Sequence, residues 1–514
     1  MSDSIVKHLN FGKEARNKVF KGIDKLTKAV SSTLGAGGKC VMLEDSSGKP
    51  QITKDGVTVA NTITLLDPVE NMGATLLKEA ARQTVKEAGD GTTTATVLAH
   101  SILNKAINPN VNSRELKNGI NSAVEKVIKY LEEKSIEVEG DMLDQVATIS
   151  TDNDKNLGKI IASAFKEVGT NGVVSMEISK DEDTTYEVVD GAILNQGLKN
   201  FHFITDKEKG TAELNNPLVL IVENKIENAR KIQSVLEYVI KNKRSLLIIA
   251  ECDVAVASML AMNKIKGNIK VNIVDSPDYG LNRKQILQDI AVITGGKVFN
   301  EDLGDDIDLI SNDYLGEANK CVTNSDETVI QVNEVSEQTK LLIDSVKKQL
   351  KKASTPGKII QLEKRLALLN GKVGIIKVGA NSEIELKEKS DRVEDAICAT
   401  KAAIKEGILP GGGIALLNAA QNIKSNSDGE TVLLEAIKSP FNTILENAGI
   451  ESKEPSKEGE GLDVVTGNMV NMINNGIIDP LLVTKSALKN AASVATTILS
   501  TDCVINNIRT HEGN

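Results

Sequence analysis

Apolar residues recur at helical spacing in the first quarter of the chain. Val19, Ile23, Leu26 and Val30 lie three or four positions apart, which predicts an amphipathic helix over residues 15–34. The same pattern predicts helices over residues 72–88, 93–107 and 115–134. Two short β-rich segments, residues 39–43 and 57–63, are separated by SSGKP and TKDG turns and predict a small hairpin. This part of the chain is therefore expected to be mostly helical.

The middle of the chain alternates between strands and helices. From residue 136 to about 190 we expect one helix followed by two strands, at 157–168, 173–178 and 185–189. From 191 to 374, the apolar strands LVLIVE, SLLIIAE and IKVNIVD alternate with helices at 229–241, 254–263 and 284–294. Continuous apolar strands are typical of a sheet covered on both faces. We expect a small α/β module followed by an independent α/β domain.

The last third returns to helices. Two charged helices at 334–353 and 358–369, joined by the helix breaker STPG, predict a helical hairpin. A strand at 374–379 precedes further predicted helices at 391–406, 432–447, 464–475 and 483–499. Because both ends are α-rich around an α/β centre, we expect the middle to be inserted into a domain that the ends share. Gly191 and Gly374 are candidate hinges.

Composition narrows the class of protein. The 514 residues suffice for about three domains. Lys and Arg number 61 against 71 Asp and Glu, and this net charge of −10 has the wrong sign for a nucleic-acid partner. Aromatic residues make up only 2%, so base-stacking platforms are not expected.

Cysteine and histidine usage indicates a reducing compartment and no zinc site. The five cysteines form no CxxC, and the four histidines never fall at ligand spacing. Charged residues interrupt the start of the sequence by Lys7 and recur at Lys13, Glu14, Arg16 and Lys18, so it lacks the apolar run of a signal peptide. No uncharged stretch of about 20 apolar residues occurs. We expect a soluble, cytosolic protein with no membrane partner.

The strongest local signal is GDGTTTATVL, residues 89–98. Two glycines flank Asp90, and three threonines then open an apolar helix, so hydroxyls, backbone N–H groups and the positive helix end converge. This arrangement can hold phosphate, and Asp90 would lie among phosphates only with a cation such as Mg²⁺ between them. An ordinary polar helix cap explains the same residues about equally well.

Other segments carry weaker signals. STLGAGGKCV joins a helix to a strand through a glycine-rich turn, but it fails the Walker A pattern because cysteine follows its lysine. ITKDGVTVA places Lys54 and Asp55 at a turn, and PGGGIALL opens a helix with three glycines. RVEDA puts Asp395 on a helix, and NGIIDPLLV puts Asp479 at a turn. Each of these segments is also compatible with a plain loop, an exposed helix face or a helix start.

Taken together and in this order, these segments resemble the group I chaperonins, the GroEL-type family. From about Phe11 to Cys503 the matching motifs are in register: TLG, ITKDGV, ENMGA, GDGTTTATVL, LLIIAE, RKQILQDIA, TGG, IKVGA, RVEDA, EGILPGGG, GIIDP and SALKNAASVA. The resemblance implies a multidomain α and α/β fold, the chaperonin-type three-domain subunit. Its parts would be a mostly α equatorial ATP-binding domain (1–136 and 406–514), a small α/β intermediate hinge domain (137–190 and 375–405) and an inserted α/β apical domain that binds substrate and co-chaperonin (191–374).

The resemblance also implies an activity. It predicts an ATP-dependent chaperone that encloses non-native polypeptides in a seven-membered homo-oligomeric ring, single or double, beneath a GroES-type co-chaperonin. Mg²⁺- and K⁺-dependent ATP hydrolysis would drive folding. Two alternatives remain: a passive ring that holds polypeptide without productive turnover, and a metabolic phosphotransferase, for which the sequence offers no acceptor site.

Site residues follow from the matching motifs. Asp395 would position or activate water, with Asp55 as the second carboxylate, while Asp90 would coordinate Mg²⁺ and Thr33 would help place K⁺. The residues implied to contact the nucleotide are Thr33, Leu34, Gly35, Lys54, Asp90, Gly91, Thr92, Thr93, Thr94, Gly412, Asp463 and Asp479.

Polypeptide capture needs exposed apolar surface on the apical domain. The candidates, each of which could instead belong to the core, are Leu198, Phe201, Phe203, Ile204, Ile232, Leu236, Leu260 and Met262.

The sequence also departs from the family. After Thr33-Leu34-Gly35 the family usually has Pro-Lys, and Ala36-Gly37 here removes a rigid ring and a positive charge. Residues 422–431 and 449–461, which relatives use for contact between stacked rings, form shorter stretches than usual. We therefore expect a weakened or absent ring-to-ring interface.

Overall fold

The structure is a computed structural model that describes residues 7–44, 48–107, 112–138, 140, 142–151, 154–169, 173–179, 181–207, 210–277, 280–300, 314–332, 336–352, 356–451, 454–455 and 457–507. The chain divides into two compact units. Unit 1 comprises Met1–Ala162, Ile178–Thr184 and Val378–Asn514, and unit 2 comprises Ser163–Glu177 and Thr185–Lys377.

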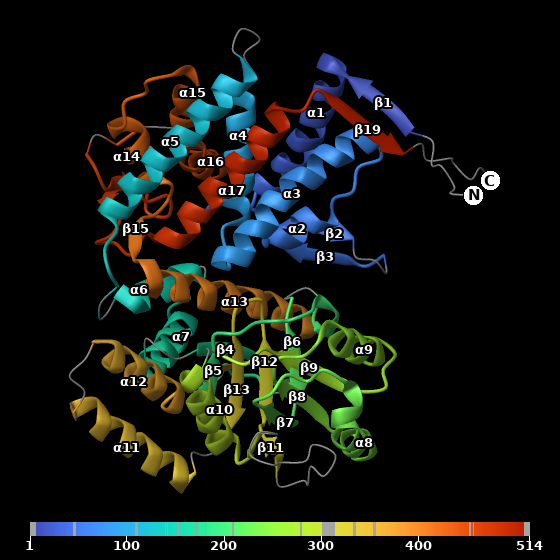
Figure 1. Cartoon of the computed structure of the whole chain (residues 1–514). Helices are drawn as coiled ribbons and strands as arrows, with labels where there is room; N and C mark the ends of the chain where they lie inside the picture. Colours follow the sequence, from blue (N-terminus) through green and yellow to red (C-terminus); the bar gives the residue numbers. More distant parts are fainter. Residues whose placement is uncertain are drawn as a thin grey trace. The chain divides into compact units, whose positions relative to one another are not determined.

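Unit 1 is built on a bundle of long helices from both ends of the chain. The helices α3 (Pro68–Ala88), α4 (Thr92–Lys105) and α5 (Ser113–Lys134) pack against α17 (Leu481–Leu499), and α1 (Gly12–Ser31) packs against α3 and α4 (Figure 1). Their apolar stripes form one core, in which Ile23, Leu26 and Leu98 are fully buried. These helices confirm the elements that the apolar spacing predicted.

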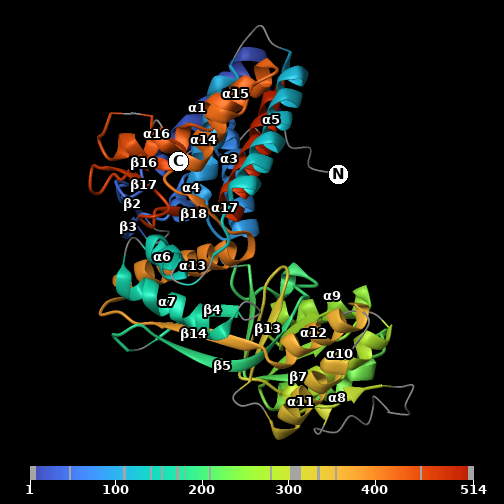
Figure 2. The same cartoon turned by 90° about the vertical axis from the view of Figure 1, so that its left-hand side faces the viewer.

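Further elements of unit 1 surround this bundle. The strand β1 (Lys7–Phe11) pairs antiparallel with β19 (Cys503–Asn507), and β15 (Ile408–Pro410) pairs with β18 (Ile478–Pro480). Figure 2 shows α15 (Asp428–Ala436) lying along α5. Further helices of unit 1 include α6 (Met142–Ser150), α13 (Glu383–Glu406), α14 (Ile414–Asn422) and α16 (Ser439–Asn447), while α7 (Lys155–Val168) begins in unit 1 and ends in unit 2.

Unit 2 contains a five-stranded sheet with both faces covered. The strands β7 (Pro217–Val222), β8 (Ser245–Ile249) and β9 (Lys270–Val274) are parallel, as are β7 and β10 (Val298–Phe299), and β11 (Gly316–Glu317) joins β7 antiparallel. Alternate residues of β7 and β8 face opposite sides. One side packs on the short helices η1 (Phe201–Phe203) and η2 (Ala229–Ile232) and on α8 (Gln233–Lys241) and α9 (Val254–Ile265); the other packs on α10 (Gly280–Thr294), α11 (Glu337–Lys352) and α12 (Pro356–Leu369).

A second, six-stranded sheet completes unit 2. Its order is β4 (Val173–Ile178), β14 (Lys372–Val378), β5 (Thr185–Leu194), β13 (Thr328–Val332), β12 (Lys320–Thr323) and β6 (Ala212–Asn215). The predicted strands and helices of this region are therefore present.

Three local predictions are wrong. Residues 57–63 are not a strand: the helix α2 (Gly56–Thr62) begins there, and the hairpin pairs β2 (Val41–Glu44) with β3 (Pro50–Thr53). Residues 464–475 are not a helix, because β16 (Glu460–Leu462) pairs with β17 (Met469–Asn471). Residues 432–447 form two helices, α15 and α16, which are separated just before Pro440, a residue that suits the first turn of a new helix.

The predicted break at 354–357 lies partly outside the described residues, with α11 ending at Lys352 and α12 beginning at Pro356. Among the helices of the described part, none has both the length and the apolar character needed to cross a membrane.

Candidate functional site

Asp55 is fixed at the start of α2. Its carboxylate accepts hydrogen bonds from the backbone N–H of Val57 at 2.9 Å and of Thr58 at 2.8 Å, and from the Thr58 hydroxyl at 2.6 Å. The KDG motif is therefore a helix cap, which anchors the carboxylate rigidly.

Asp90 lies in the turn between α3 and α4. Gly89 and Gly91 on either side have φ values of +76° and +96°, a backbone region that glycine adopts without steric cost. No side chain caps the N-terminus of α4, so the N–H groups of its first turn can bind an anion. A Cβ on Gly56 would lie 2.3 Å from the Thr93 Oγ1, so the start of α2 lies directly against this turn.

Asp395 and Asp479 reach the same place from the C-terminal half of the chain. Asp479 belongs to β18, and its carboxylate accepts a hydrogen bond from the Gly413 N–H. Asp395 belongs to α13, which lies against the Asp90 turn, because a Cβ on Gly89 would lie 2.3 Å from the Cβ of Cys398. Four segments of unit 1 thus bring four carboxylates together.

These carboxylates repel one another. Burial, followed by the charges of Asp90 and Asp55, raises the pKa of Asp395 well above its ordinary value. Burial and then Asp55 raise the pKa of Asp90, and burial with Asp90 raises the pKa of Asp479 to about 7. Among the residues described, no three His, Cys, Asp or Glu side chains could hold a metal ion by themselves. A cation would therefore have to share the aspartates with oxygens of a ligand.

The turn after α1 is the glycine-rich segment that contains Thr33. The Thr33 hydroxyl donates to the Val30 carbonyl at 2.9 Å, so it is engaged within the turn. Between Val30 and Gly35, the Thr33 carbonyl is the one that accepts no hydrogen bond from the described residues. Carbonyl oxygens are suitable ligands for a hard cation such as K⁺.

The hairpin of β16 and β17, whose turn begins at Asp463, lies beside Gly412. A Cβ on Gly412 would meet Met472 at 2.9 Å, and one on Gly461 would meet the same side chain at 2.8 Å. However, the Asp463 carboxylate accepts hydrogen bonds from Val465 N–H at 2.9 Å and from the Thr466 hydroxyl at 2.7 Å, so it closes its own turn. Asp463 is not among the charges that act on Asp90, Asp395 or Asp479.

The structure divides the apolar candidates of unit 2. Phe203, Ile232 and Leu260 are buried core residues, so the prediction that they form exposed surface is wrong. Phe201 and Met262 are exposed at 73% and 54%, whereas Leu198, Ile204 and Leu236 are partly buried.

Sequence reasoning missed several residues. Val254 and Ile265 extend the exposed face of α9 that carries Met262, and their spacing with Ser258 along one helix face was a usable signal. Gly413 was missed as the donor to Asp479, because a backbone N–H leaves no trace in the sequence.

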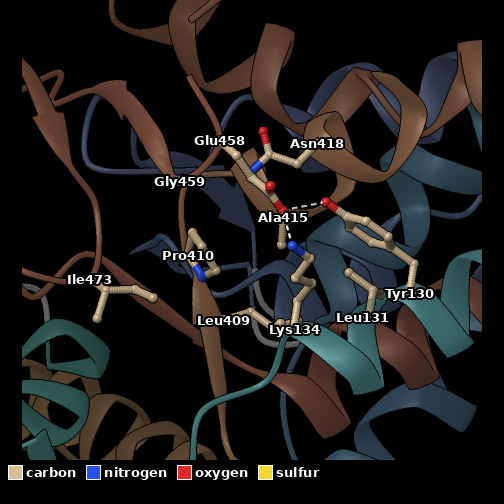
Figure 3. Close-up of a pocket in the computed structure, with 10 residues that line it drawn as sticks. All are labelled: Tyr130, Leu131, Lys134, Leu409, Pro410, Ala415, Asn418, Glu458, Gly459 and Ile473. Carbon is tan, nitrogen blue, oxygen red and sulfur yellow. Dashed lines mark hydrogen bonds and ion pairs between the residues drawn. The ribbon is translucent and has the colours of Figure 1, made fainter. Parts of the chain in front are cut away.

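A separate cavity of about 100 Å³ lies elsewhere in unit 1. Figure 3 shows the Tyr130 hydroxyl and the Lys134 ammonium pointing toward the Glu458 carboxylate at its edge. None of the four aspartates lines it.

Comparison with known proteins identifies the family. The family model of the TCP-1/cpn60 chaperonin family matches residues 26–509. The chain belongs to this chaperonin family. The predicted fold class, the chaperonin-type three-domain subunit, is confirmed as well.

Two solved structures share the chaperonin fold. Both are of the chaperonin gp146 from bacteriophage EL 2 (Pseudomonas aeruginosa), crystallised in the presence of ATP-BeFx. Crystal form II matches with a TM-score of 0.72 and 22% identity over 99% of this chain and 100% of that one. Crystal form I matches with a TM-score of 0.64 and 21% identity over 98% and 99%.

Proposed function

We propose that this chaperonin binds and hydrolyses ATP at the group formed by Asp55, Asp90, Asp395 and Asp479, and that hydrolysis drives the folding of polypeptides enclosed in a ring. The convergence of these carboxylates beside the uncapped N-terminus of α4 carries the proposal. It is unexplained as a purely structural feature, since gathering partly buried carboxylates whose charges repel one another destabilises a fold.

The chemistry needs positioning rather than a covalent nucleophile. The N–H groups at the start of α4 would bind phosphate, while Thr92 to Thr94 line the same turn. Asp90 would hold Mg²⁺ and the Thr33 carbonyl K⁺, and these cations would neutralise phosphate charge. Asp395, with its raised pKa, would orient the attacking water and accept its proton, and Asp55 would stabilise that arrangement.

Polypeptide would bind to unit 2 on an apolar surface that a soluble protein otherwise avoids. Phe201 on η1 is 73% exposed, and Val254, Met262 and Ile265 on the outer face of α9 are 76%, 54% and 57% exposed. A cytoplasmic seven-membered ring, a GroES-type co-chaperonin and the three domains with the boundaries given above complete the proposal.

Asp395→Ala tests the proposed hydrolysis. ATP turnover in Mg²⁺ and K⁺ should fall at least about a hundred-fold, because a positioned base contributes on that order. Nucleotide affinity by calorimetry should stay nearly unchanged. Glu388→Ala removes a half-exposed carboxylate from the same helix, about two turns away, and serves as the matched control.

Unchanged turnover in Asp395→Ala would contradict the role of Asp395. A parent protein that binds ATP and polypeptide but shows no turnover would favour the second candidate, a passive holding ring. That candidate gains weight from Ala36 and Gly37, which stand where the family usually has a rigid and a cationic residue.

A further inference from the structure

The turn that contains Thr33 is held from outside by the end of α16. Asn447, the last residue of that helix, donates from its side-chain amide to the Ser31 carbonyl at 2.8 Å and to the Leu34 carbonyl at 2.9 Å. Ser31 ends α1, and Leu34 follows Thr33, so a single side chain spans the turn.

Both acceptors are carbonyl oxygens, so the side chain of residue 447 must donate a hydrogen bond to each of them. Only the NH₂ group of the amide can donate two hydrogen bonds in this position. A carboxylate of the same shape would place an oxygen against two carbonyl oxygens and would repel both.

Glycines let the turn approach α16 closely. A Cβ on Gly37 would lie 2.8 Å from the Ala448 Cα, and one on Gly35 would lie 3.0 Å from the Ile444 side chain. Any larger residue at position 37 would therefore push the turn off the helix end.

The turn also has its own backbone hydrogen bonds. The Gly38 N–H donates to the Gly35 carbonyl at 2.9 Å, and the Lys39 N–H donates to the Ser32 carbonyl at 2.8 Å. Together with the two bonds from Asn447, these leave the Thr33 carbonyl without a donor within the described turn.

We propose that Asn447 is a positioning residue that holds the Thr33–Gly35 turn in the shape required to bind ATP. Ala36-Gly37 lacks the rigid proline ring that the family usually has after this turn. The two hydrogen bonds from Asn447 restrain the turn instead. This assignment rests on one part of the proposed function, namely that the turn contacts the nucleotide.

Asn447→Ala and Asn447→Asp test the role of the two hydrogen bonds from the Asn447 amide. Asn118→Asp is the control, because it makes the same charge change at an exposed site on α5. Three quantities are measured: ATP affinity by calorimetry, turnover at saturating ATP, and amide hydrogen exchange of residues 33–39 without nucleotide. Asn447→Ala should weaken ATP binding about ten-fold, the scale of a lost hydrogen bond or two, and Asn447→Asp should weaken it further. Turnover at saturation should stay within about two-fold.

Hydrogen exchange of the turn should accelerate in both Asn447 variants and not in Asn118→Asp. Unchanged exchange and affinity in Asn447→Ala would overturn the proposal, and so would a loss of saturated turnover with affinity retained. If Asn447→Asp does not fold, Asn447→Ala decides. If the parent protein binds no ATP, the proposed function fails, whereas exchange still tests whether Asn447 orders the turn.

Discussion

At the residue scale, Gly89 controls how closely α13 approaches the Asp90 turn. Ala at this position would bring its Cβ within 2.3 Å of the Cys398 Cβ and would strain a backbone with φ of +76°. Asp395 lies one helical turn before Cys398, so displacing α13 moves Asp395 as well. We expect Gly89→Ala to lower ATP turnover about ten-fold or more, since small misplacements of catalytic groups are costly.

Gly267→Ala is the control that separates the clash with Cys398 from the strain of a left-handed backbone. Gly267 also has φ of +76°, but a Cβ there would meet nothing within 4 Å. Both variants should lose about 1 kcal/mol of stability from the left-handed backbone. Equal turnover in the two, measured under identical conditions, would show that the contact with Cys398 has no role in positioning Asp395.

Local motifs predicted which residues meet at the site better than they predicted how each residue is held. Asp90 between two glycines indicated a tight turn before a helix, and the structure has that turn. The resemblance implies that Asp463 contacts the nucleotide, which stays a prediction, and it gave no sign that the Asp463 carboxylate closes its own hairpin turn. Side-chain partners of this kind depend on local geometry that motif matching does not specify, and the hydrogen bonds from Asn447 join positions more than 400 residues apart.

At the scale of elements, the long helices of unit 1 cross at glycines. A Cβ on Gly22 of α1 would lie 1.9 Å from the Glu70 carbonyl, and one on Gly73 of α3 would lie 2.3 Å from the Val19 carbonyl. Helix propensity alone favours Ala over Gly by about 1 kcal/mol. Because the crossing leaves no room, we expect Gly73→Ala to destabilise the protein by about 1–3 kcal/mol instead.

Urea unfolding of the nucleotide-free protein measures this change. Thr75→Ala, at an exposed position two residues further along α3, is the control and should stay within about 0.5 kcal/mol of the parent. A stabilising Gly73→Ala would mean that α1 and α3 separate at little cost.

Periodicity predicted the long helices well and the short elements poorly. Residues 57–63 have β-branched composition, yet the Asp55 cap and the contact of Gly56 with Thr93 start a helix of two turns there. Residues 464–475 look helical by spacing, but Gly467 with φ of +73° and the Asp463 turn close a hairpin. Tertiary contacts outweigh weak propensities in segments this short.

At the scale of the whole molecule, the segment that follows α16 folds back on its own subunit. Glu454 accepts from Gln421 at 3.1 Å and from Lys438 at 3.3 Å. Glu458 accepts from Tyr130 at 2.6 Å and pairs with Lys134 at 2.8 Å, beside the cavity of Figure 3. Their charges are thus neutralised within the subunit. These side chains are therefore less available for ion pairs with a second ring.

The surface best suited to contacts between neighbouring subunits of a ring lies on two small sheets of unit 1. The two-stranded sheets β1–β19 and β2–β3 each expose large apolar side chains, with Phe11 at 61%, Met42 at 71% and Ile52 at 59%. Two-stranded sheets are marginal by themselves, and their open edges readily pair with another chain. We therefore expect these sheets to join neighbouring subunits.

Sedimentation tests both inferences about assembly. The parent should sediment as one ring of seven 55.1 kDa subunits, with and without ATP, and Met42→Glu should shift it to monomers because burying an unpaired charge is costly. Leu341→Glu is the control: this side chain is 70% exposed on α11 of unit 2, and the variant should remain a ring. A fourteen-subunit particle that is stable with and without ATP would contradict the expected weakening or absence of the ring-to-ring interface. A Met42→Glu ring as stable as the parent would show that subunits meet through another surface.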